Sequence, residues 1–170
     1  AGLVGYYSPG HANMRSGFEL GIKVRLSLTR AGTTYYKFVG RLIAITPSPG
    51  ARGTRVTLCT AVDWLDEAAR YKLTGIATQT TKRADQLIDT IESAMTKGAE
   101  ATSYDPAQLE YLYALDDVQD ENTTALEAMH RAVMSDLGIL VLRGDTTQGG
   151  TLKYYDRRTR SNPGSPLATI

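Results

Sequence analysis

The sequence predicts an α+β fold in which an antiparallel meander or small β-barrel is joined to an α/β insertion with two helices. Residues 22–29 alternate apolar with charged or hydroxyl side chains, which is the period of a half-buried strand. After residue 62 the apolar residues instead recur every three to four positions, which is the period of a helix. The order of these segments lacks the regular alternation of a parallel doubly wound sheet.

Three antiparallel strands are expected first. They cover residues 22–29, 34–46 and 55–62, with a turn at 31–32 and a hairpin loop at 48–53. On the second strand, Tyr36 and Phe38 are expected on one face and Tyr35 on the other. Gly40 lies in the middle of this strand and predicts a bulge or a sharp bend.

A short helix and two longer ones follow. Asp63 is expected to cap a helix over residues 64–71, and the strongest helical pattern covers residues 82–97. Thr124 and Glu127 form a capping box that opens the last helix. The apolar stripe of the first long helix contains Ala84, Leu87, Ile88, Ile91, Ala94 and Met95. The expected stripe of the second contains Leu126, Met129, His130, Val133, Met134 and Leu137.

The remaining segments complete one compact unit. Short strands are expected at 76–80, 109–115, 139–142 and 151–155, a polar loop at 100–106, an acidic connection at 116–122 and a hairpin loop at 144–150. We divide the chain into an N-terminal meander (1–62), the α/β insertion (63–138) and a closing hairpin with the C-terminal tail (139–170). The start at Ala1 without Met suggests a processed chain or a piece of a longer one.

Composition excludes several classes of protein. The 170 residues contain 19 Lys and Arg against 18 Asp and Glu, so nucleic acid is not expected as the primary partner. The single cysteine, Cys59, allows no internal disulfide, and we expect it to be a small buried residue rather than a reactive thiol. No apolar run approaches the ~20 residues of a membrane span.

The sequence contains no enzyme signature. A nucleophile elbow requires Gly-x-Ser-x-Gly and a phosphate loop Gly-x-x-x-x-Gly-Lys-Ser/Thr, and neither occurs. His130 lies on the expected apolar stripe, where burial frequencies favour a core-edge histidine over a buried general base. His11 has no catalytic group near it in the sequence. We therefore predict no enzymatic activity and no cofactor.

An acidic cluster raises the question of a metal. It consists of Asp116, Asp117, Asp120 and Glu121. The spacing of an EF-hand is absent, and carboxylates ahead of a helix are favoured by the helix dipole alone. We predict no metal site.

A basic stretch and the only tryptophan are candidates for partner contacts. Arg157, Arg158 and Arg160 can contact phosphates or a carboxylate-bearing partner, or they can be a solvated strand end with Asp156 pairing one arginine. Trp64 either wedges the short helix onto the strands or anchors a partner. The apolar neighbours of Trp64 favour the packing role.

Taken together, the segments resemble the hub proteins of phage tails and baseplates, and the spike proteins of type VI secretion. The resemblance is carried by residues 36–42 (Tyr-Lys-Phe-Val-Gly-Arg-Leu), 63–65 (Asp-Trp-Leu), Gln79 with 84–88 (Ala-Asp-Gln-Leu-Ile), 125–129 (Ala-Leu-Glu-Ala-Met), 137–140 (Leu-Gly-Ile-Leu) and 154–158 (Tyr-Tyr-Asp-Arg-Arg). Residues 7–10 (Tyr-Ser-Pro-Gly) followed by 21–25 (Gly-Ile-Lys-Val-Arg) are similar to minor tail proteins of long-tailed phages.

This resemblance spans about residues 6–160 and rests on the order of the segments. It implies small barrels joined by an α/β insertion, a ring of three copies at the tail tip, and no catalytic residues in this portion. It also implies a virion protein, assembled in the host cytoplasm, that links the tail tube to tip proteins. Family members continue into a second barrel, whereas this chain stops at Ile170.

Two other functions remain open. A hydrolase needs only scattered carboxylates such as Asp105 and Glu110. A module that binds carbohydrate or peptide would use exposed tyrosines. For the tail hub, the side chains expected at a partner interface are Tyr6, Tyr7, Tyr35, Arg157, Arg158 and Arg160.

Overall fold

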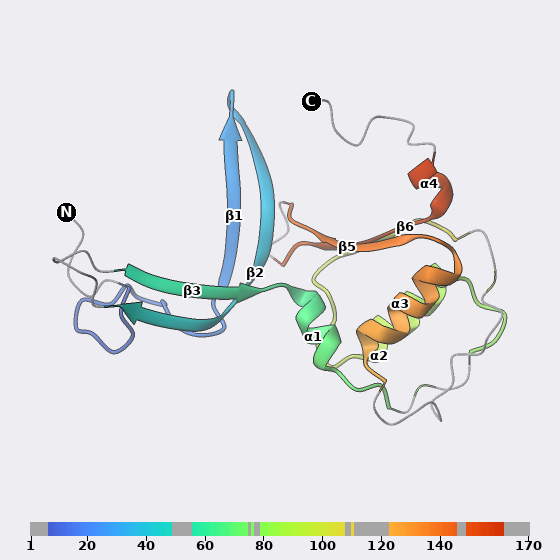
Figure 1. Ribbon diagram of the computed structural model, residues 1–170, viewed down its shortest axis with the longest axis horizontal. Coiled ribbons are helices and arrows are strands. Elements are labelled where there is room, and N and C mark those ends of the chain that lie inside the picture. The colour runs from blue at the N-terminus through green and yellow to red at the C-terminus, as the bar shows by residue number, and fades with distance from the viewer. Residues whose placement is uncertain are drawn as a thin grey trace.

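The structure is a computed structural model that describes residues 7–48, 56–74, 76, 79–107, 110, 123–145 and 149–161. Over these residues the chain forms six strands and four helices, which confirms the α+β class (Figure 1). Three strands form a projecting sheet, and the other elements form a layered unit beside it. The predicted strand at 109–115 and acidic connection at 116–122 lie outside the described residues, apart from Glu110.

The projecting sheet is the predicted meander. Strands β1 (Lys23–Arg30), β2 (Thr33–Ser48) and β3 (Val56–Val62) pair antiparallel in the order β1-β2-β3. We call these strands the arm. The first turn has Ala31 at φ 49° and Gly32 at φ 80°, as a type I′ hairpin requires. No closed barrel forms within the described part of the chain, because β1 and β3 remain edge strands. The barrel expectation is therefore not met.

The long strand β2 changes direction in its middle, as expected at Gly40 (Figure 1). A Cβ at Gly40 would lie 2.2 Å from the carbonyl oxygen of Val62, so only glycine fits this close approach. Two bulges flank the bend, because Lys37 and Ile43 have no partner in the strand pairing. These features divide the arm into two hairpins with different directions.

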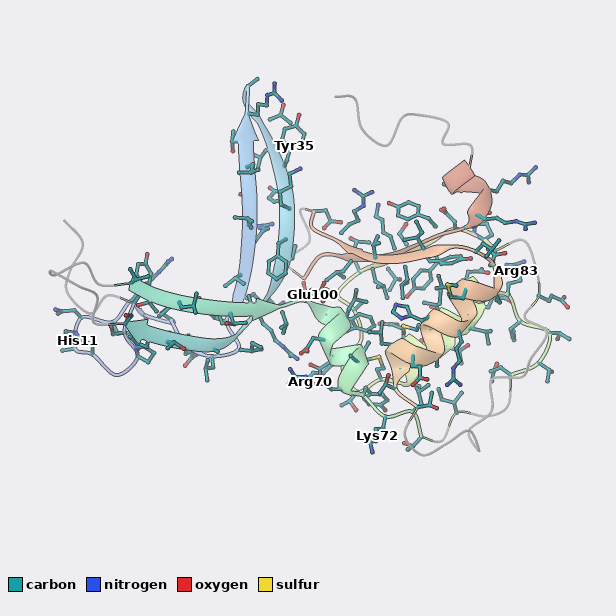
Figure 2. The ribbon with its side chains drawn as sticks, in the orientation of Figure 1. His11, Tyr35, Arg70, Lys72, Arg83 and Glu100 are labelled. Carbon is teal, nitrogen blue, oxygen red and sulfur yellow. The ribbon has the colours of Figure 1, made fainter. Side chains whose placement is uncertain are left out.

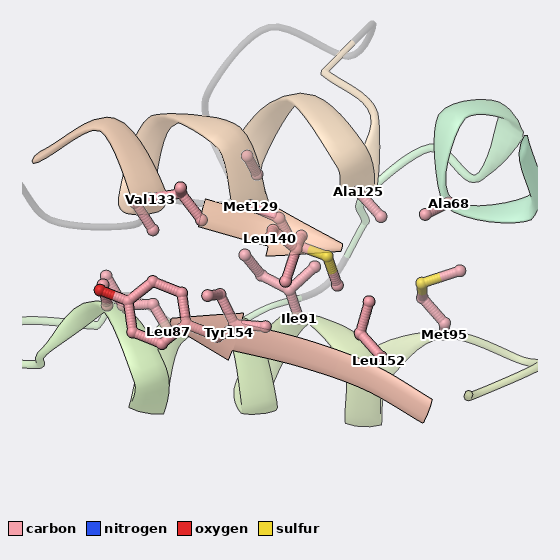
Figure 3. Close-up of a cluster of buried hydrophobic side chains, with 14 of the residues drawn as sticks. Ala68, Leu87, Ile91, Met95, Ala125, Met129, Val133, Leu140, Leu152 and Tyr154 are labelled. Carbon is pink, nitrogen blue, oxygen red and sulfur yellow. The ribbon is translucent and has the colours of Figure 1, made fainter. Parts of the chain in front are cut away.

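The second part, which we call the α/β unit, has helices on one face of a three-stranded sheet (Figures 1 and 3). Its elements are α1 (Trp64–Arg70), α2 (Ala84–Ala94), β4 (Thr102–Tyr104), α3 (Ala125–Ser135), β5 (Ile139–Arg143), β6 (Thr151–Tyr155) and α4 (Arg157–Ser161). The strand order is β4-β6-β5, with β4 parallel and β5 antiparallel to β6.

Three segments differ from the prediction. The loop expected at 100–106 contains β4, a strand too short to show a period in the sequence. The strand expected at 76–80 does not form among the described residues of that segment. The basic stretch after β6 begins α4 rather than extending the strand, and Asp156 accepts a hydrogen bond from the backbone N–H of Thr159 at 2.6 Å. Asp156 is thus a buried cap.

The predicted caps and the first long stripe are confirmed. Asp63 Oδ1 accepts from the N–H of Leu65 at 3.1 Å, and Thr124 Oγ1 accepts from the N–H of Glu127 at 3.2 Å. Helix α2 is shorter than the predicted 82–97. Its buried residues are Ala84, Leu87, Ile88 and Ile91, with Met95 at the C-cap also buried. Ala94, also predicted on this stripe, is exposed.

One hydrophobic core holds the α/β unit together (Figure 3). Side chains from α2 and α3 meet Leu140, Leu152 and Tyr154 of the β5–β6 hairpin. Trp64 packs against this core, as the sequence favoured. The core includes no residue of the arm, where Phe18, Val39 and Leu42 are the buried hydrophobic residues among those described up to residue 62.

The predicted stripe of α3 is partly right, because Met129 and Val133 are buried and Leu126 packs against the core. The buried residues of α3 are Ala125, Ala128, Met129, Ala132 and Val133. His130, Met134 and Leu137 instead lie on the exposed side, so His130 is neither a core residue nor a buried base. The small alanines let α3 approach α2 closely, which larger side chains would prevent.

Candidate interaction surfaces

One face of the arm presents apolar side chains to solvent. Leu26 pairs with Phe38, and Leu28 pairs with Tyr35. Directly opposite residues of antiparallel strands share a face of the sheet. Leu26 and Leu28 are each 57% exposed and Tyr35 is 49% exposed, whereas Phe38 is half-buried. We call Leu26, Leu28, Tyr35 and Phe38 the arm face.

The bulge at Lys37 creates this face. The sequence expectation placed Tyr35 and Phe38 on opposite faces, because they are an odd number of residues apart. The extra residue in β2 reverses that relation, so Tyr35 joins Phe38. The ammonium of Lys37 lies 5.6 Å from the centre of the Tyr35 ring.

The opposite face of the arm lies toward the α/β unit. The Arg25 guanidinium stacks over Tyr36 at 4.7 Å and donates a hydrogen bond to the carbonyl of Asp145 at 3.4 Å. A Cβ at Gly144 would lie 3.2 Å from Cγ2 of Val39, so this buried valine packs against the loop after β5. The arm face therefore points away from the rest of the molecule.

Ion pairs hold the base of the arm. Lys23 pairs with Glu100, and Arg41 pairs with Glu67. Lys97 also reaches Glu67, at 3.9 Å. Figure 2 shows Glu100 at this junction and Tyr35 near the far end of the arm. A cavity of about 240 Å³ lies between the pairs and Trp64, whose Nε1 donates to the carbonyl of Lys97 at 3.0 Å.

Charge is strongly divided between the two parts. From residue 20 to residue 62 the sequence has seven Lys and Arg and no Asp or Glu. From residue 63 to residue 161 it has 17 Asp and Glu against 11 Lys and Arg. The overall charge of +1 conceals this division. A count by segment would have found it in the sequence.

A second exposed apolar surface runs along α3. We call Leu126, His130, Met134 and Leu137 the α3 stripe. The first three recur every four residues along one side of α3, with Leu126 half-buried against the core, and Leu137 follows the end of the helix at φ 54°. Met134 is 68% exposed and Leu137 is 55% exposed. A shallow groove beside them also contains Glu127 and Arg131, which form an ion pair at 2.6 Å.

The expected interface residues are found in two separate places. Tyr7 lies beside the arm, where its carbonyl accepts from Thr57 Oγ1 at 3.1 Å and its ring meets Phe18 edge to face at 5.2 Å. Tyr35 is on the arm face. Arg157 and Arg158 are exposed on α4, in the α/β unit. Tyr6 and the side chain of Arg160 lie outside the described residues.

The candidates for chemistry are not assembled into a site. His11 is exposed and accepts at Nδ1 from the N–H of Asn13, at 3.1 Å. Asp105 is half-buried, and Glu110 is exposed in an isolated bridge with Arg83. Among the described residues, no group of three or more His, Cys, Asp or Glu could hold a metal ion. Cys59 is exposed, contrary to expectation, because the arm has no second layer above it.

The two side chains with the largest pKa shifts are tyrosines of the α/β unit. The hydroxyl of Tyr154 donates to Oδ2 of Asp136 at 2.5 Å, and both residues are buried. Burial first, and then this hydrogen bond, raise the pKa of Tyr154 well above its ordinary value. Burial also raises the pKa of Tyr104, with Glu92 and Asp89 adding to the effect. Both hydroxyls belong to the α/β unit rather than to an exposed site.

No protein-family model matches the chain, and no curated protein matches it either. Within the part of the chain that the structure describes, no helix has the length and apolar character needed to cross a membrane.

Proposed function

We propose that the protein is a structural subunit of a phage tail hub, which assembles through its arm. The observation that carries this proposal is the arm face, an apolar surface on a sheet that has two open edges and little core of its own. Open sheet edges favour pairing with another chain, and a fold normally covers or closes them.

Energetics support an assembled state. A sheet of this size is stable when one of its faces packs against another layer. Full burial of a leucine contributes about 1.5–3 kcal/mol relative to exposure. Burial of Leu26, Leu28 and Tyr35 in an interface would therefore favour association of the chain. A neighbouring copy would supply the missing layer, and cyclic symmetry would limit the number of copies.

The proposed role as a tail hub also gives this assembly a location in the phage particle. The resemblance described above implies a ring of three copies at the tail tip, between the tail tube and the tip proteins. An arm that projects from a compact unit suits such a linking role. The proposed partners are further copies of this chain and the adjacent tail proteins.

The test is the position of the chain in the phage particle. Purified tails would be cross-linked, digested and searched for peptides of this chain, and an antibody against it would locate it by electron microscopy. We expect several copies at the tail tip, with cross-links between copies. Absence from the particle, or isolated copies with no contact between them, would overturn the proposal.

A further inference from the structure

We propose that the arm face of one copy docks on the α3 stripe of the next copy, in a head-to-tail contact. This inference rests on the proposed function and names the two surfaces that make the assembly. Each surface is apolar and exposed in the single chain: Leu26, Leu28 and Tyr35 on one side, Met134 and Leu137 on the other.

The α3 stripe is an apolar surface against which the sheet of another copy can pack. Helix α3 turns Ala125, Ala128, Met129, Ala132 and Val133 toward the core and leaves His130 and Met134 exposed. Each of Leu126, His130 and Met134 lies four residues from the next, so the three side chains form one continuous ridge along the helix. A contiguous apolar surface of this kind, bordered by the charged pair Glu127 and Arg131, is typical of an interaction site.

Charge identifies the occupant as another copy of this chain. The segment that forms the arm has seven basic residues and no acidic one, whereas residues 63–161 have 17 acidic residues against 11 basic ones. On the arm, Arg30 falls on the same side of β1 as Leu28, and Lys37 lies beside Tyr35. The arm of one copy and the α/β unit of another therefore attract each other.

The contact must be between two chains. Within one chain the arm is fixed at its base by the pairs Lys23–Glu100 and Arg41–Glu67, and Arg25 bonds the loop after β5. Figure 1 shows the arm and α3 on opposite sides of α1, with the sheet of β5 and β6 alongside α3. A contact between two different surfaces repeats from copy to copy, and it ends when the ring closes.

The same features disfavour nucleic acid as the occupant of the arm. A phosphate backbone would be attracted by the arm but repelled by the acidic segment that follows it. The exposed leucines of the arm face are also poor ligands for phosphate. Binding of nucleic acid in place of self-association is one of the outcomes tested below.

The experiment uses two variants that each damage one surface. Leu28→Glu places an acid on the arm face, and Met134→Glu places one on the α3 stripe; both positions are exposed, so neither change should unfold the chain. Leu20→Glu is the matched control, because Leu20 is exposed but lies on neither surface. Circular dichroism checks folding, and sedimentation velocity gives the mass of each species.

The expected result is specific to head-to-tail contact. Each damaged variant alone is monomeric, with at least a tenfold weaker association than the parent, and the control assembles like the parent. A mixture of the two damaged variants forms a one-to-one dimer and nothing larger, because only one intact arm face meets one intact stripe. The parent chain does not bind a single-stranded or duplex DNA oligonucleotide under the same conditions.

The other outcomes separate this inference from the proposed function. If Met134→Glu assembles like the parent while Leu28→Glu does not, the arms contact each other and the inference is wrong, but self-assembly stands. A parent chain that is monomeric and binds the oligonucleotide contradicts both.

A second measurement covers the case in which a glutamate variant misfolds. Tyr35→Cys and Met134→Cys chains, each in a Cys59→Ser background, would be mixed and oxidised in air. We expect the mixed disulfide between the two chains to be well over half of all dimers, because random pairing of equal amounts of the two chains would give about half. A purely statistical distribution of the three products would overturn the inference.

Discussion

Tyr35 of β2 lies directly opposite Leu28 of β1, and the two side chains share the exposed face of the arm. This pairing depends on the bulge at Lys37, which shifts the register by one residue. Without the bulge, Tyr35 would point toward the α/β unit. The bulge thus converts a half-polar strand into one side of an apolar contact surface.

Replacing Ile91 by alanine tests the core of the α/β unit. Ile91 is fully buried between the helices and the sheet, so its loss removes apolar burial and leaves a cavity. We expect a cost of about 2–5 kcal/mol in the free energy of unfolding, measured by denaturant titration. Ser93→Ala, an exposed position on α2, is the control and should change stability by less than about 0.5 kcal/mol. Equal stability of the two variants would contradict this packing.

The Tyr154→Phe variant tests the buried pair. It leaves the carboxylate of Asp136 buried without the donor that now lies 2.5 Å away. We expect a loss of about 1–3 kcal/mol, seen as a lower midpoint of denaturation. Tyr155→Phe removes the hydroxyl of a half-buried tyrosine on the same strand and should leave that midpoint unchanged. If both variants melt like the parent, the hydrogen bond adds nothing to stability.

The raised pKa of Tyr154 and of Tyr104 predicts a loss of stability in alkali. Below the ordinary tyrosine pKa of 10.0, both tyrosines are protonated in the folded and in the unfolded chain, so their ionisation does not lower the free energy of unfolding. Above it, the unfolded chain ionises first, so the stability falls as pH rises toward the higher folded values. Denaturant titration between about pH 9 and 11 should show this decline, and it should be weaker in Tyr154→Phe. A flat profile would argue against burial of these hydroxyls.

The Gly40→Ala substitution tests the bend of β2. The added Cβ would approach the carbonyl oxygen of Val62 to 2.2 Å, and the backbone of β3 would have to move. We expect amide exchange in β3 to accelerate by about tenfold or more, equivalent to ~1.4 kcal/mol, while α2 and α3 keep their protection. Thr34→Ala, near the tip of the arm, is the control. Unchanged protection in β3 would show that the crossing tolerates a side chain.

Removal of metal should have no effect. Excess chelator is expected to leave the melting temperature of the chain unchanged, because a metal bound only to the folded state would raise it by mass action. The acidic run 116–121 is the segment of interest, and it lies outside the described residues. A fall of several degrees, reversed by added calcium, would show that this run holds a cation.

Patterns among neighbouring residues predicted most of the helices and strands, but not the exposed apolar surfaces of the arm and of α3. The alternation of β1, the caps Asp63 and Thr124, and the β5–β6 hairpin could be read from the sequence, because each depends on neighbouring residues. The full buried face of α3 could not, because the burial of its alanines beside Met129 and Val133, with Met134 exposed, depends on how α2 packs against it. The bulge at Lys37 depends on pairing between two strands, which no single-strand pattern records.

Sedimentation velocity of the unmodified chain, over a range of protein concentrations and at low and high salt, tests the central claim most directly. We expect one discrete assembly, with the mass of a closed ring of three copies, that weakens as salt screens the attraction between the basic arm and the more acidic α/β unit. A chain that sediments as a monomer at every concentration and salt would contradict the account of the arm as an assembly surface.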